Sequence, residues 1–138
     1  MYEKIIAAYD GSKPAESAFS QAVEIASRFR SEVVVLAVIR PAEPAARVEI
    51  DALIDSAREH YEQSFSKLKA AAAERGVTVR TSIVIGHPAE QILLVAAQER
   101  AGLIVMGRRG ITAAQRWLLG STSGRVLQYA HCPVLVVH

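Results

Sequence analysis

Apolar residues along this chain follow two alternating patterns. Short runs rich in Val, Ile and Leu predict buried strands, and longer stretches with apolar residues every three or four positions predict helices. Several strand candidates are almost continuously apolar, which is typical of parallel strands covered on both faces. The predicted strands are Lys4 to Tyr9, Glu32 to Ile39, Val77 to Ile85, Gly102 to Gly107 and Pro133 to Val137.

One helix is predicted between each pair of consecutive strands. The first is expected to follow Ser12 as its cap and Pro14 in its first turn, and the second to end at Gly76. The third is expected to begin at Pro88, and the fourth to run from about Ser121 to Tyr129. The residues predicted to face inward are Ala15, Ala18, Ala22, Ile25 and Phe29, then Ile50, Ile54, Ala57, Tyr61, Phe65, Leu68 and Ala72, then Ala89, Ile92, Leu93 and Ala96.

The order of these elements predicts the fold class. Strands that alternate with helices require right-handed crossovers, and a parallel sheet with helices on both faces buries this pattern. We therefore expect an α/β fold with a five-stranded parallel sheet, in a single domain over residues 1–138. Two prolines in the segment from Arg40 to Ala46 favour a loop there.

Charge and composition exclude several functional classes. A formal net charge of +2 is far from the clustered positive charge of a dedicated nucleic-acid binder, whereas small anionic ligands remain possible. The apolar stretch after Lys4 stops at Asp10, too short for a signal peptide or a membrane span, so we expect a cytoplasmic protein that does not contact membranes. Cys132 is the single cysteine, which permits no internal disulfide, and the histidines show no zinc-site spacing.

The segment that follows the fourth predicted strand carries the most informative chemistry. Met106 and Gly107 end the strand, and Gly120 immediately precedes the fourth predicted helix. Glycines let the backbone approach a ligand closely, and the first turn of a helix offers unpaired N–H groups to an anion. The sequence therefore predicts a phosphate cradle. The side chains that can add hydroxyl groups or charge to it are Ser121, Thr122, Ser123, Arg108 and Arg109, and one hydroxyl, such as that of Ser121, can supply an oxygen to Mg²⁺.

Simpler structural interpretations of these residues remain open at this point. Gly107 and Gly110 can merely shape a turn, Ser121 can merely cap a helix, and arginines in a glycine loop are often just solvated. Other nucleotide motifs do not fit, because the chain has neither a G-x-x-x-x-G-K-[ST] run nor G-x-G-x-x-G after the first strand.

The spacing Gly107-x2-Gly110-x9-Gly120-Ser121 resembles the nucleotide motif of ATP-binding universal stress proteins. The resemblance extends to the start of the chain, residues 5–12, and to its end, residues 132–137. It implies the strand order 3-2-1-4-5 of the Rossmann-like adenine nucleotide alpha hydrolase type. In that order the first and fourth strands are neighbours, and a crevice forms at their carboxyl ends.

The resemblance also implies ligand contacts at three further residues. Asp10 would contact the adenosine part through a ribose hydroxyl, although an aspartate before glycine is also a common turn cap. Ala8 would line the adenine pocket, and the backbone at Val38 would read the base edge. The implied ligand is ATP or another adenine nucleotide, with Mg²⁺ bound through the phosphates.

The last predicted strand, Val134 to Val137, is expected at a sheet edge with nothing to protect it from pairing. Pairing with its own copy would give the homodimer that the resemblance implies, whereas the sequence identifies no protein partner. The leading hypothesis is therefore a nucleotide-dependent stress-response or signalling module. No general base accompanies the phosphate loop, so rapid ATP hydrolysis is not expected. A slow ATPase or nucleotide phosphohydrolase, and a nucleotide-free dimeric module, are the alternatives.

Overall fold

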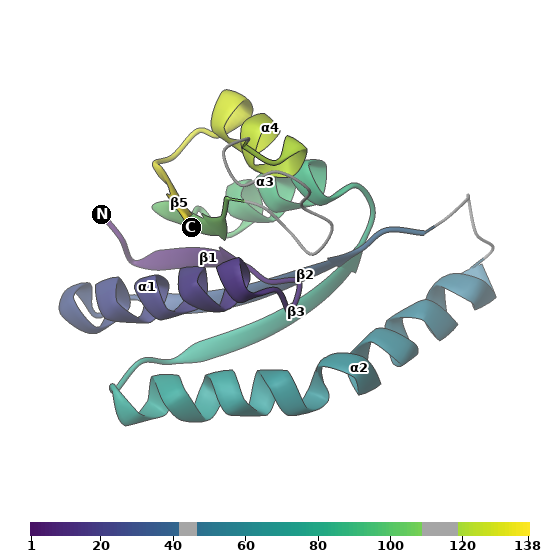
Figure 1. Cartoon of the computed structure of the whole chain (residues 1–138), viewed down its shortest axis with the longest axis horizontal. Helices are drawn as coiled ribbons and strands as arrows, with labels where there is room; N and C mark the ends of the chain where they lie inside the picture. Colours follow the sequence, from purple (N-terminus) through teal and green to yellow (C-terminus); the bar gives the residue numbers. More distant parts are fainter. Residues whose placement is uncertain (42–46, 109–118) are drawn as a thin grey trace.

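The five strands form one parallel sheet with the order β3-β2-β1-β4-β5, as predicted (Figure 1). The computed structural model describes residues 1–41, 47–108 and 119–138. Parallel ladders join β1 to both β2 and β4, β2 to β3, and β4 to β5. The strands are β1 Lys4–Ala8, β2 Glu32–Ile39, β3 Val79–Ile85, β4 Leu103–Gly107 and β5 Val134–Val137.

The helices cover the two faces of the sheet in pairs. They are α1 Lys13–Phe29, α2 Arg47–Glu74, α3 Pro88–Gln98 and α4 Ser121–Tyr129. Residues of α1 and α2 share one buried cluster with one set of strand side chains, and residues of α3 and α4 share a second cluster with the other set. Figure 1 shows α3 and α4 packed together, with α1 and α2 on the opposite side.

The strand sequences explain the two clusters, because successive side chains of a strand point to opposite faces. In β1, Ile5 and Ala7 belong to the cluster under α1 and α2, and Ile6 belongs to the cluster under α3 and α4. In β2, Val33 and Val34 divide in the same way. The continuous Val and Ile runs therefore arise from burial on both faces, as predicted.

The predicted helix starts are confirmed at α1 and α3. Ser12 is the N-cap of α1, and its Oγ accepts a hydrogen bond from the Ala15 amide at 3.2 Å. Pro88 opens α3, after an N-cap residue, His87, whose side chain makes no cap hydrogen bond. The Ser12 cap and the proline at the first position of α3 mark where these two helices begin.

The prediction that Phe29 of α1 faces the core is wrong. Phe29 is 59% exposed, whereas Ala15, Ala18 and Ala22 are buried as expected. The helix ends at this residue, since Arg30 already adopts a left-handed conformation with φ 54°. The Phe29 ring instead packs edge-on against Tyr2, with 5.2 Å between ring centroids, on the outside of the core.

No helix within residues 1–41, 47–108 and 119–138 combines the length and the apolar character needed to cross a membrane. The two edge strands of the sheet are β3 and β5, and the edge position of β5 confirms the prediction for Val134 to Val137.

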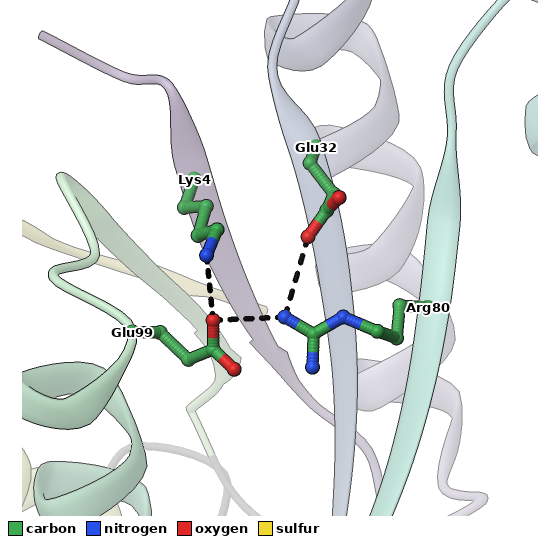
Figure 2. A network of polar contacts seen from close by, with 4 residues as sticks. All are labelled: Lys4, Glu32, Arg80 and Glu99. Atoms are coloured by element: carbon green, nitrogen blue, oxygen red, sulfur yellow. Dashed lines mark hydrogen bonds and ion pairs between the residues drawn. The ribbon is translucent and has the colours of Figure 1, made fainter.

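A chain of ion pairs crosses the amino ends of three strands (Figure 2). The Glu99 carboxylate, at the end of α3, accepts hydrogen bonds from Lys4 Nζ and Arg80 Nη2, both at 2.8 Å, and Arg80 also contacts Glu32 at 3.3 Å. The two cations, Lys4 first, hold the pKa of Glu99 below its usual range. They also offset the unfavourable position of a carboxylate at the negative end of a helix.

Replacing this carboxylate by Glu99→Gln should lower the free energy of unfolding at neutral pH by about 1 kcal/mol, since both pairs are partly exposed. A carboxyl with a lowered native pKa stabilises the fold above its unfolded pKa, and this contribution is lost as pH falls through the native value. The difference from the native protein should therefore vanish in acid. Urea unfolding across pH measures it, and Glu74→Gln, at an exposed site, should stay within about 0.5 kcal/mol. A difference independent of pH would contradict this account.

Candidate functional site

A pocket opens at the carboxyl ends of β1 and β4, where the chain leaves these neighbouring strands toward opposite faces of the sheet. This position is the usual ligand site of a doubly wound fold. The pocket has about 150 Å³ of accessible space and opens to solvent. It is lined by Ala8, Tyr9, Asp10, Ser12, Ala15, Leu36, Val38, Pro88, Ile92, Met106, Gly107, Thr122 and Ser123.

Asp10 lies in this pocket and also caps the turn after β1. One carboxylate oxygen accepts a hydrogen bond from the Ser12 amide at 2.9 Å, and Gly11 between them has φ 84°. The positive φ explains why glycine follows the aspartate. A carboxylate has about four acceptor positions, so the turn leaves Asp10 with capacity to accept further hydrogen bonds from a ligand hydroxyl.

An aromatic group beside Asp10 was not predicted as part of the site. Tyr9 lines the pocket, and its ring centroid lies 6.0 Å from that of Tyr61 and 6.2 Å from that of Phe65. Burial, then the charge of Asp10, raises the pKa of Tyr61. The sequence pattern predicted that Tyr61 and Phe65 face the core from the second helix, but their contact with Tyr9, just after β1, is a long-range contact that periodicity does not give.

Gly107 has a packing role that is independent of any ligand. A Cβ atom on this residue would lie 2.7 Å from Pro14 Cβ and 2.9 Å from the Pro14 carbonyl carbon. The first turn of α1 therefore passes directly over the end of β4. Glycine at this position allows that close approach, which the sequence interpretation had assigned to a ligand.

Ser123 holds the turn that follows β4. Its buried hydroxyl donates to the Gly107 carbonyl oxygen at 2.8 Å and to the Arg108 carbonyl oxygen at 3.0 Å. A hydroxyl has one hydrogen, so these backbone groups engage the donor that the sequence interpretation offered to phosphate. The contacts tie the first turn of α4 to the end of β4.

The N-terminus of α4 faces the same region with no side-chain cap. Gly120 is the N-cap, and its amide donates to the Arg108 carbonyl oxygen at 3.0 Å. The amides of the first helical turn have no acceptor within the helix. Thr122 and Ser123 line the pocket, whereas Ser121 is exposed and is not part of the lining.

First-turn residues of three helices thus meet around one pocket: Ala15 of α1, Pro88 of α3 and Thr122 of α4. The first turns of α1 and α3 contain Glu16 and Glu90, and the first turn of α4 contains no acidic residue. Helix N-termini carry partial positive charge, which glutamates in the first turn counteract. The α4 end is therefore the most favourable place in the pocket for an anion.

The structure brings together most of the predicted site residues. The lining contains Ala8, Asp10, Val38, Met106, Gly107, Thr122 and Ser123. Arg108 and Gly120 lie in the adjoining turn, whereas Arg109 and Gly110 lie outside the described residues. The lining residues Leu36, Pro88 and Ile92 were not predicted as site residues, since they follow from how β2 and α3 pack around β1. In the described part of the chain, no three His, Cys, Asp or Glu side chains gather to hold a metal ion.

The model of the Universal stress protein family matches residues 1–138. The chain belongs to this family. It is 38% identical to the universal stress protein MJ0531 of Methanocaldococcus jannaschii over 99% of this chain and 82% of that protein. The solved structure of the universal stress protein UspA from Lactobacillus plantarum superposes with a TM-score of 0.88 at 27% identity, over 99% of this chain and 98% of that one.

Two more distant structures share the fold and were solved with ligands. A universal stress protein in complex with cAMP has a TM-score of 0.78 at 24% identity, covering 99% of this chain and 97% of that one. The universal stress protein from Archaeoglobus fulgidus in complex with dAMP has a TM-score of 0.72 at 21% identity, covering 99% and 98%. These two likenesses establish the fold of this universal stress protein.

Proposed function

We propose that this chain is an adenine-nucleotide-binding domain over residues 1–138 that acts as a homodimeric, nucleotide-dependent module in stress response. ATP is the first candidate ligand. The observation that carries the proposal is the meeting of three helix N-termini around a mostly apolar pocket that also contains one carboxylate, Asp10. Apolar walls suit a base, the carboxylate suits a sugar hydroxyl, and helix N-termini suit phosphate.

The lining residues suggest the direction of the ligand. Ala8 and Val38 form apolar wall at the ends of β1 and β2 and would contact adenine. Asp10 lies beside them and would accept a hydrogen bond from a ribose hydroxyl. The phosphates would then extend to the first turn of α4, at Thr122. A magnesium ion would take most of its oxygen ligands from phosphates and water, since the described lining offers Asp10 as its one carboxylate.

Relatives with this fold support an adenine ligand. The structures solved in complex with cAMP and dAMP carry adenine with a single phosphate group. Binding of adenine therefore has stronger support than binding of three phosphates, and the number of phosphates is what the titration must determine. ADP, AMP and cAMP belong in the same test as ATP.

Calorimetric titration of the ligand-free protein tests this proposal. ATP should bind more tightly than adenosine, because only ATP places charge at the α4 N-terminus, and Mg²⁺ should strengthen ATP but not adenosine binding. A base comparison with GTP should favour ATP if the pocket reads adenine. Absence of binding by ATP, ADP, AMP and cAMP alike would refute nucleotide binding and leave the nucleotide-free module.

The open edge of β5 supports the homodimer. Carbonyl oxygens of Pro133 and Val137 accept hydrogen bonds from Ile104 and Arg108 of the β4 side, at 3.0 and 2.7 Å. Peptide groups alternate along a strand, so those of Val134 and Val136 point away from β4. They are available to pair with the same strand of a second copy.

Proline at one of these outward positions should separate the subunits. Val136→Pro removes an outward N–H and leaves the ladder to β4 in place, so the variant should fold and sediment as a monomer at micromolar concentration. The native protein should sediment as a dimer under the same conditions. Val136→Ala, which keeps the N–H, is the control and should remain dimeric. A native monomer would refute this part of the proposal without affecting the nucleotide titration.

A further inference from the structure

A second pocket lies on the α3 and α4 side of the sheet, near the amino end of β4. It shares no lining residue with the pocket described above. Its lining residues are Leu93, Ala96, Ala97, Arg100, Ala101, Ile104, His131 and Cys132, and we refer to it as the Cys132 pocket. It is built from the second half of α3, the start of β4 and the segment that connects α4 to β5.

The floor of the Cys132 pocket is apolar and its rim is basic. Five lining residues are Ala, Leu or Ile, and the charged or titratable side chains besides the thiol are Arg100 and His131. No aspartate or glutamate is among the lining residues. Within the described residues, Arg100 and His131 form no ion pair, whereas Lys4 and Arg80 both pair with Glu99.

The turn after α3 fixes Arg100 at this rim. Arg100 adopts φ 54°, and its amide donates to the Ala97 carbonyl oxygen at 3.2 Å. The next amide, of Ala101, donates to the Ala96 carbonyl oxygen at 2.9 Å. These bonds close the helix end, so the guanidinium is attached to a rigid part of the backbone. Arginine stays charged at all ordinary pH values and matches the geometry of a carboxylate.

The volume of the Cys132 pocket indicates the size of the group that its walls can cover. The pocket has about 160 Å³ of accessible space. An apolar cavity of about 150 Å³ is known to hold a benzene molecule. An apolar body of about that size, with one negative group at the rim, is the chemistry that the lining complements.

We propose that the Cys132 pocket binds a small monocarboxylate with a compact apolar body, with the apolar body between α3 and Cys132 and the carboxylate at Arg100 and His131. The class includes benzoate and branched short-chain fatty acids. This site is separate from the nucleotide pocket and does not depend on the proposed function.

Cys132 provides a direct reporter of occupancy, because it is the single cysteine in the sequence and it lines the pocket. The thiol is half-buried, and burial raises its pKa. Alkylation by iodoacetamide at mildly alkaline pH should therefore be slow but measurable. A ligand in the pocket must slow it further, since the ligand covers the sulfur.

The experiment measures the alkylation rate of the native protein with benzoate, and with benzamide and acetate as matched probes. Benzoate at about four times its dissociation constant should reduce the rate to about one fifth by mass action. Benzamide lacks the charge and acetate lacks the apolar body, so neither should protect at the same concentration. Amide chemical shifts in NMR spectra should change at Ala97, Arg100 and Ala101 with benzoate.

Two variants test the two halves of the site. Arg100→Asn removes the charge, and asparagine tolerates the positive φ of this position. The variant should fold and should bind benzoate with an affinity that is lower by about tenfold or more. Ala97→Leu fills the mouth of the pocket from the exposed face of α3 and should abolish protection of Cys132. Gln98→Leu adds the same side chain one residue away, outside the lining, and should leave benzoate binding unchanged.

Each contrary result overturns the proposal. If neither benzoate nor a branched fatty acid protects Cys132 or changes the amide shifts, the pocket does not bind monocarboxylates. Equal protection by benzamide, or an unchanged affinity in Arg100→Asn, would show an apolar cavity without carboxylate recognition. Protection that persists in Ala97→Leu would place benzoate elsewhere on the protein.

Discussion

Gly107→Ala is expected to destabilise the ligand-free protein by about 1–3 kcal/mol, the usual effect of overpacking. The added Cβ would lie 2.7 Å from Pro14 Cβ and 2.9 Å from the Pro14 carbonyl carbon. The second of these is a backbone atom in the first turn of α1, which cannot rotate away as a side chain can. Either α1 or the end of β4 must shift, and each shift disturbs packing between two buried elements.

Gly124→Ala is the matched control for this substitution. Gly124 lies inside α4, and its added Cβ would have Leu119 Cδ2 as its nearest neighbour at 3.7 Å, which is ordinary contact. Alanine in a helix is favoured over glycine by about 1 kcal/mol, so this variant should be as stable as the native protein or more stable. Urea unfolding without nucleotide measures both variants.

The pair separates two roles for the first glycine of the motif. Destabilisation by Gly107→Ala in the absence of nucleotide would show that the residue is required by the packing of α1 on β4. Equal stability of Gly107→Ala and the native protein would contradict that account and leave close approach of a ligand as its reason. Because Ser12 and Ala15 of the same helix start line the pocket, a shift of α1 would also alter the site.

The helices and strands could be predicted from the sequence because each is marked by a local residue pattern. The Val and Ile runs of β1 and β2, the cap at Ser12 and the proline at Pro88 all depend on neighbours within a few residues. Phe29 was misplaced because periodicity continues to the last turn of a helix, whereas burial depends on how far the sheet extends beneath it. The strand order itself came from family resemblance rather than from local pattern.

The candidate site likewise contains residues that the sequence predicted and residues that it did not. Met106 and Thr122 were predicted because they lie directly at a strand end and in the first turn of a helix, which the sequence locates well, whereas the ligand contact of Asp10 was implied by family resemblance. The packing of Tyr61 against Tyr9, which lines the pocket, was not predicted, because it depends on where α2 lies relative to the end of β1. The packing role of Gly107 likewise depends on the approach of α1, which local sequence does not reveal.

A negative charge at the start of α4 should abolish most ATP binding. Thr122→Asp places a carboxylate in the first turn, where it would face the phosphates across the pocket. Charge repulsion in this partly enclosed site should weaken ATP about 100-fold, which corresponds to about 2.7 kcal/mol. The same carboxylate is favourable for the helix dipole, so the thermal midpoint should stay equal or rise. Calorimetry and thermal unfolding on one sample give both values.

Three comparisons decide what a loss of ATP binding means. Gln128→Asp adds the same charge at an exposed position near the other end of α4, so ATP affinity should remain native if local charge is the cause. Thr122→Asn matches aspartate in size without its charge and should retain most of the affinity. Adenosine should bind Thr122→Asp as it binds the native protein, because it carries no phosphate. An equal loss of affinity for ATP and for adenosine would instead place the base at α4 and reverse the proposed direction of the ligand. An unchanged affinity for both would show that the phosphates do not bind at this helix.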